Sequence, residues 1–240
     1  MLGYALLTFA SDRARARLAF ERALELNPHY VQARCWYGLF YLQWVAGEME
    51  EGLSQARRAL DDDPLSAYTT VIVSACLGTI GRLEEAIEAG RLAMERDPGS
   101  YVARWSLGVV LVEAGRFDQA IGLLEATPVE SAGALELVSL AFAYQGAGRP
   151  AEAVAVHEAM LARRAVRYVP HAFRALTAAA VGRQDEAIAS ALAAWEDREP
   201  PFVLFARHFP QWRPLHADPR FQAILREMDG RSNQEPGTTN

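Results

Sequence analysis

The residue types that carry most enzyme chemistry are scattered along this chain rather than grouped in reactive patterns. No two histidines stand at the helical spacing that binds zinc, and the sequence contains no His-Glu-x-x-His. A site that combines His208, His216 and Asp218 around Trp212 is possible, but His157 and the other histidines fit ordinary structural positions. We therefore predict no bound metal and no cofactor. The five histidines are His29, His157, His171, His208 and His216.

Nucleophilic catalysis has no better support in the sequence. There is no Gly-x-Ser-x-Gly motif, and the two cysteines, Cys35 and Cys76, are expected to pack inside helices. Two distant cysteines exclude a disulfide scaffold and suit a reducing, cytoplasmic compartment. Gly146-Ala147-Gly148 follows a predicted helix, so it indicates a turn rather than a phosphate loop. We predict no catalytic residue and no enzyme activity.

Charge and hydropathy also argue against two classes of partner. All 24 basic residues are arginine, and the net charge of -6 is unfavourable for general nucleic-acid binding. Arginines gather near 13–22 and 163–167, but helical rotation would spread them around their helices. The apolar stretch 1–10 is far shorter than the roughly 20 residues of a membrane span, and it has no cleavage site. We expect neither nucleic acid nor membrane as a partner.

An internal repeat is the strongest pattern in the sequence. Five glycines recur at spacings of 34, 34, 33 and 34 residues, and most are followed by a polar turn, acidic residues and an alanine. A period of this length is typical of a helical solenoid in which each unit is one helix pair. The glycines are Gly47, Gly81, Gly115, Gly148 and Gly182.

Each repeated position has a physical reason. Glycine permits the positive φ that ends the first helix of a pair, and acidic residues favour the start of the second. Pro28, Pro64 and Pro98 cannot continue a helix and therefore stop the second helix. Apolar residues recur at spacings of three and four, with no sustained strand-like alternation. The chain is predicted to be all-α.

Family resemblance strengthens this prediction. Leu107-Gly108-x-x-Leu111, Tyr37-Gly38-x-x-Tyr41 and Ala16-x-x-x-Phe20 resemble positions of the tetratricopeptide repeat, although Arg34 and Arg104 replace its tryptophan. The resemblance implies a right-handed α-α superhelix over residues 1–200. It would comprise a partial repeat, 1–30, and repeats 31–66, 67–100, 101–133, 134–167 and 168–200. The second repeat carries about two extra residues, and Pro128 shortens the fourth.

The periodicity stops near residue 200, where an aromatic segment begins. Asp218-Pro219 predicts the start of a last helix, and we expect residues 201–229 to form a helical cap on the solenoid. Residues 230–240 are polar and predicted to be disordered. The run from Trp212-Arg213-Pro214-Leu215 to Asp218-Pro219-Arg220-Phe221 is similar to the end of the tetratricopeptide arrays in bacterial multidomain regulatory proteins.

The inner face of such an array is the predicted binding surface. Its positions are largely apolar, without the lysine and asparagine that clamp a C-terminal carboxylate in relatives. Three alternatives stay open: a groove for a partner's apolar segment, ordinary core residues, or a face filled by the C-terminal block or a second copy. The candidate groove residues are Leu39, Tyr68, Val71, Val102, Trp105, Val109, Leu135, Val138, Phe142 and Val169.

Two functions follow from this interpretation. The first is a non-catalytic scaffold that binds a protein or peptide segment on its concave face. The alternative is a regulatory or self-association module of a larger bacterial protein, attached to a kinase, cyclase or winged-helix domain that is not among these residues. A homo-oligomer is possible in either case.

Overall fold

The computed structural model describes residues 2–9 and 12–232, and throughout these residues all regular structure is helical. Six helix pairs follow one another along the chain, and a C-terminal block of shorter helices ends it. The pairs are α1 (Leu2–Phe9) with α2 (Arg13–Leu26), α3 and η1 (Val31–Trp36, Tyr37–Ala46) with α4 (Met49–Asp62), α5 (Ala67–Thr79) with α6 (Leu83–Arg96), α7 (Tyr101–Glu113) with α8 (Phe117–Leu124), α9 (Ala134–Gly146) with α10 (Pro150–Ala162), and α11 (His171–Ala180) with α12 (Gln184–Glu196).

The repeated glycines lie in the turns between the two helices of a pair, as predicted. All five have positive φ, between 69° and 81°. In the third hairpin the N–H of Arg82 donates to the carbonyl of Leu77 at 3.0 Å, which satisfies a carbonyl at the end of α5. The alanine five residues after each of the last four glycines is fully buried, so the paired helices approach closely there. These alanines are Ala86, Ala120, Ala153 and Ala187.

The second pair absorbs its extra residues in a π-helix. The segment η1 has i→i+5 hydrogen bonding over Tyr37–Ala46, and a wider turn holds more residues over the same rise. The turn at the end of this helix is also wide: the N–H of Glu48 donates to the carbonyl of Leu42, six residues earlier, at 2.7 Å. Gly52 replaces the expected alanine because a Cβ there would lie 2.6 Å from the carbonyl oxygen of Gly38.

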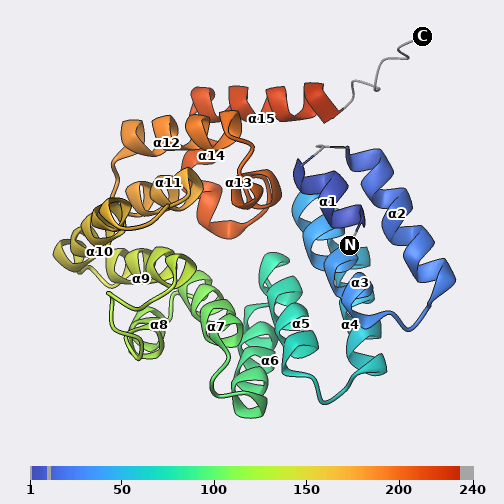
Figure 1. Ribbon diagram of the computed structural model, residues 1–240. Coiled ribbons are helices and arrows are strands. Elements are labelled where there is room, and N and C mark those ends of the chain that lie inside the picture. Colours follow the sequence, from blue (N-terminus) through green and yellow to red (C-terminus); the bar gives the residue numbers. More distant parts are fainter. Residues whose placement is uncertain (1, 10–11, 233–240) are drawn as a thin grey trace, which may run out of the picture.

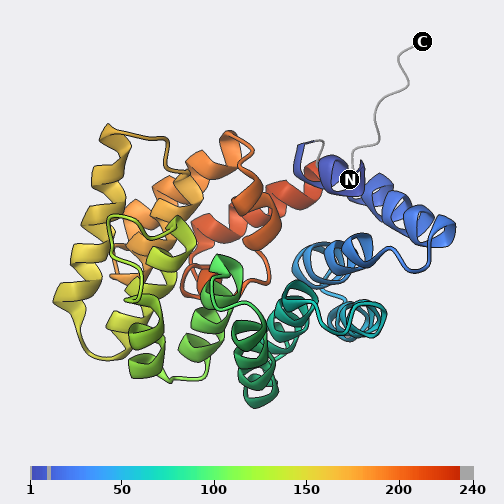
Figure 2. The same ribbon diagram turned by 60° about the horizontal axis from the view of Figure 1, so that its bottom comes forward.

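The pairs stack in sequence order and wind into the predicted right-handed superhelix. In Figure 1, α5, α7, α9 and α11 form the inner layer, and α4, α6, α8, α10 and α12 form the outer layer. Figure 2 shows the same curved stack turned by 60°. The inner helices contact one another from pair to pair, so one large hydrophobic core runs along the array, and a small separate cluster of Val71, Ala93 and Ala103 lies between α5, α6 and α7.

The C-terminal block does more than cover the last pair. It comprises α13 (Pro200–Phe205), η3 (Pro210–Trp212), α14 (Arg213–His216) and α15 (Pro219–Ser232). Helix α15 packs on α12, as expected for a cap, but α13 crosses the hollow of the superhelix and contacts α1 and η1. The sequence left open whether this block fills the inner face, but it indicated no contact with α1 or η1.

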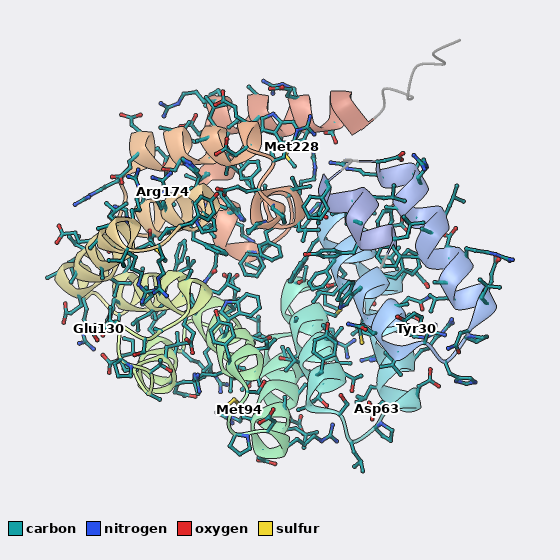
Figure 3. The ribbon with its side chains drawn as sticks, in the orientation of Figure 1. Tyr30, Asp63, Met94, Glu130, Arg174 and Met228 are labelled. Atoms are coloured by element: carbon teal, nitrogen blue, oxygen red, sulfur yellow. The ribbon has the colours of Figure 1, made fainter. Side chains whose placement is uncertain are left out.

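Polar contacts join the two ends of the array. Asp229 on α15 accepts from Arg13 of α2 at 2.9 Å and lies 2.7 Å from a guanidinium nitrogen of Arg207. Met228, labelled in Figure 3, is buried at the same end of α15. The first and last parts of the chain are therefore neighbours, and the superhelix closes on itself.

The last helix begins where the sequence indicated and ends later. The side chain of Asp218 accepts from the N–H of Arg220 at 2.8 Å, next to Pro219 at the helix start. Helix α15 continues to Ser232, three residues into the predicted tail, and the remaining tail residues, 233–240, lie outside the described residues. None of the described helices combines the length and the apolar composition that crossing a membrane requires.

Candidate binding pocket on the concave face

An apolar pocket lies on the concave face, where three successive inner helices meet the C-terminal block. It holds about 590 Å³ of empty space, part of it open to solvent. Figure 3 shows side chains from the inner helices and from the C-terminal block pointing into the space that the array encloses. The walls come from η1 (Leu39, Phe40, Trp44), α5 (Tyr68, Val71, Ile72, Ala75, Gly78, Thr79), α7 (Val102, Trp105, Ser106, Val109, Val110, Glu113) and the segment Phe209–Pro210.

Aromatic contacts fix the wall that the C-terminal block supplies. Phe209 is 3% exposed and lies against Trp44, with ring centroids 5.4 Å apart and rings near perpendicular. On its other side it meets Trp105 at 6.1 Å, while Phe205 also packs edge-on against Trp44 at 5.0 Å. Aromatic pairs in these geometries add to the apolar area that they bury. Phe209 is thus a fixed part of the pocket.

One carboxylate interrupts the apolar lining. Glu113, the last residue of α7, has a side chain that is 17% exposed and pairs with Arg213 of α14 at 2.5 Å. Burial raises the pKa of Glu113 above its ordinary value, and the guanidinium of Arg213 only partly offsets that effect. The ion pair with Arg213 therefore offsets only part of the cost of burying the charge of Glu113.

Six of the ten predicted groove residues line this pocket together. They come from three different pairs and meet because the inner helices stack side by side. Val102 and Tyr68 are each 38% exposed at the rim, while Val71 and Val109 lie deeper. The six residues are Leu39, Tyr68, Val71, Val102, Trp105 and Val109.

The other four predicted groove residues lie elsewhere. Val138 is fully buried and Val169 nearly so, while Leu135 and Phe142 pack against the core. The C-terminal block covers this part of the inner face: Gln211 donates to the hydroxyl of Ser139 at 3.1 Å, and α11 contacts α13 and α14. Two of the alternatives, ordinary core residues and a face filled by the C-terminal block, both fit this half of the face.

Phe209, Pro210 and Glu113 are pocket residues that the sequence did not single out. Glu113 precedes the repeated Gly115 by two positions, and a polar residue near the end of a helix does not by itself indicate a binding site. Phe209 and Pro210 lie beyond the last repeat, where periodicity gives no register. No sequence signal indicated which surface these two residues would meet.

Packing and hydrogen bonds within the fold account for the histidines and cysteines described next. His216 lies 2.9 Å from the carbonyl oxygen of Ala206, whereas His208 faces Gly47, so they do not form a site with Asp218. His157 is fully buried and contacts the hydroxyl of Thr177 at 2.9 Å. Both cysteines are free and buried, and burial raises the pKa of the Cys35 thiol to about 12, which disfavours the reactive thiolate.

A cluster of His171, Asp197 and Glu199 brings together side chains of metal-ligating type. Hydrogen bonds account for the buried carboxylate of Glu199, which accepts from the N–H groups of His171 and Ala172 at 2.7 and 2.8 Å. It also accepts from the hydroxyl of Tyr168 at 2.6 Å. Glu199 thus caps the start of α11, and its oxygens are already engaged.

Comparisons with known families agree with the repeat geometry. One model of the tetratricopeptide repeat matches residues 2–67, and a second model of this repeat matches residues 81–141. Together they cover more than half of the chain. The chain belongs to the tetratricopeptide repeat family. Proteins of this family are generally non-catalytic scaffolds that bind other proteins.

Solved tetratricopeptide repeat structures share this fold over most of the chain. A tetratricopeptide repeat protein from Parabacteroides merdae aligns with a TM-score of 0.63 at 15% identity, covering 94% of this chain and 84% of that one. PilW, a widely conserved type IV pilus biogenesis factor, aligns with a TM-score of 0.59 at 20% identity, covering 93% and 95%. A thermophilic member from Thermus thermophilus gives a TM-score of 0.56 at 18% identity, covering 81% and 98%. No curated protein matches the sequence at significant similarity.

Proposed function

We propose that this protein is a non-catalytic interaction module that binds an apolar polypeptide segment in the pocket between η1, α5 and α7. The observation that carries the proposal is the pocket itself, which is apolar, concave and built by three stacked pairs of a repeat that generally binds proteins. The two buried cysteines of the protein, Cys35 and Cys76, are free, which supports a reducing, cytoplasmic setting as part of the proposal.

The shape of the pocket favours a short anchor over a long helix. Phe209 and Pro210 close one side, so the open length of the face spans α5 and α7 rather than the whole array. The apolar walls around this opening suit a large apolar side chain from a partner. A segment of this kind would gain most of its affinity from such buried anchors.

Selection from a displayed library of random short peptides tests the proposal. Val102→Arg places a long charged side chain at the pocket rim, at a residue already 38% exposed, so the fold should tolerate it. We expect peptides selected on the wild-type protein to be rich in aromatic and aliphatic residues. We expect Val102→Arg to weaken their binding at least about tenfold, the loss of one anchoring contact.

The matched control is Leu92→Arg. Leu92 is 40% exposed but lies on the outer helix α6, away from the pocket. It should leave the affinity of the selected peptides unchanged, as measured by fluorescence polarisation. If both variants weaken peptide binding equally, or if neither variant weakens it, the pocket is not the binding surface.

A further inference from the structure

The pocket has one electrically distinct end. Apart from Tyr68, the described residues that line it offer a single ionisable side chain, Glu113. Its carboxylate is mostly buried, and its pKa is raised by burial, so its present surroundings stabilise the charge less well than water would. A further cation at this end would lower that cost.

The helices add negative potential at the same end. The inner helices η1, α5 and α7 run in the same direction, because each pair turns the chain back before the next begins. Residues near their C-terminal ends, Trp44, Thr79 and Glu113, all line the pocket. A helix C-terminus carries partial negative charge that favours cationic groups within about one turn.

The chain itself shows which chemistry fits there. Phe209 packs in the aromatic corner of the pocket, and four positions later Arg213 reaches the carboxylate of Glu113 at 2.5 Å. An apolar anchor followed by a guanidinium therefore already occupies the edge of this surface. The side chain of Arg213 is 58% exposed, which leaves the pair accessible from solvent.

We propose that the partner segment carries an arginine or lysine close to its apolar anchor, and that this cation joins or displaces Arg213 at Glu113. The proposal rests on the proposed function and specifies its ligand: a basic, amphipathic segment rather than an acidic one or a free C-terminal carboxylate. The arguments for this occupant are charge complementarity at Glu113 and continuity with the contact that the C-terminal block already makes.

The test uses the displayed peptide library on the wild-type protein and on the variant Glu113→Gln. On the wild-type protein we expect enrichment of an apolar anchor with a nearby arginine or lysine. On Glu113→Gln, which keeps the shape and removes the charge, we expect the same anchor without the basic residue. For one selected peptide, arginine→glutamine should weaken wild-type binding about tenfold and leave Glu113→Gln binding nearly unchanged.

Each outcome decides the proposal. Two outcomes would overturn the proposal while leaving the proposed function intact. In the first, the peptides selected on the wild-type protein are apolar but not enriched in arginine or lysine. In the second, arginine and lysine are enriched equally on the wild-type protein and on Glu113→Gln. Absence of any apolar enrichment on the wild-type protein would overturn both. Should Glu113→Gln fold poorly by circular dichroism, Arg213→Ala replaces it: removing the internal cation should strengthen the preference for basic peptides, and an unchanged or weaker preference counts against the proposal.

Discussion

Single buried groups in this protein are matched to their surroundings in ways that affect stability. His157 is fully buried, and burial keeps its pKa below the ordinary 6.5 even though Glu186 lies 3.2 Å away. The unfolded chain takes up a proton here at a higher pH than the folded chain does. The free energy of unfolding should therefore fall as pH falls below 6.5 toward the lower folded pKa.

The variant His157→Gln should lose this contribution. We expect the pH dependence of its unfolding free energy, measured by urea denaturation from neutral to mildly acidic pH, to be flatter than that of the wild type by up to about 1.4 kcal/mol per pH unit. Identical slopes for the wild type and His157→Gln would show that His157 does not titrate as described.

For single residues, the sequence predicted whether a residue is buried or lies in a turn better than it predicted which side chain the residue contacts. Turn glycines, buried alanines and buried cysteines were predictable because the repeat fixes their phase. The pairing of Glu113 with Arg213, 100 positions later, was not, since no local pattern encodes which side chains a distant segment brings. Arg34 and Arg104 replace a consensus tryptophan, and each finds a polar partner, Gln55 and Glu136 respectively.

At the scale of helices, the π-helix η1 is the main departure from the repeat. The sequence revealed two extra residues but not how they would fit, because an insertion can widen a helix or lengthen a turn. Here it widens the helix and draws α4 close, so that a Cβ on Gly52 would lie 2.4 Å from the side chain of Gln43 and 2.6 Å from the Gly38 carbonyl oxygen.

This packing predicts a reversal of the family preference. Alanine is the expected residue at position 52, yet Gly52→Ala should destabilise the protein by about 1–3 kcal/mol through overpacking against backbone. Gly122→Ala, at an exposed position of α8 with nothing near a new Cβ, should instead stabilise it by about 0.5–1 kcal/mol. Urea denaturation measures both. Stabilisation by Gly52→Ala would show that η1 and α4 are not packed this closely.

At the scale of the whole molecule, the C-terminal block turns an open array into a closed one. The sequence predicted a cap on the last pair, and α15 on α12 agrees with that role. It could not predict that α13 and Phe209 would cross to η1, since a segment outside the repeat has no register to read. The crossing shapes the candidate binding surface more than the repeats do, because it reduces a long groove to one pocket.

Closure also makes Phe209 a structural residue. Phe209→Ala removes a nearly buried ring that joins Trp44 and Trp105, so we expect a loss of about 3–5 kcal/mol in unfolding free energy. Phe9→Ala, at a ring that is 73% exposed on α1, should change it by less than about 0.5 kcal/mol. Equal effects, measured by thermal and urea unfolding, would mean that the C-terminal block does not hold the two ends together.

Site-specific photo-crosslinking tests the central claim most directly. A photoreactive amino acid is placed at Val102 on the pocket rim or, in a separate protein, at Leu92 on the outer face, two positions of nearly equal exposure. Each protein is irradiated with a labelled peptide selected on the wild type, and the products are mapped by mass spectrometry. We expect a crosslink from position 102 and none from position 92. Crosslinking from position 92, with none from position 102, would contradict binding in the concave pocket.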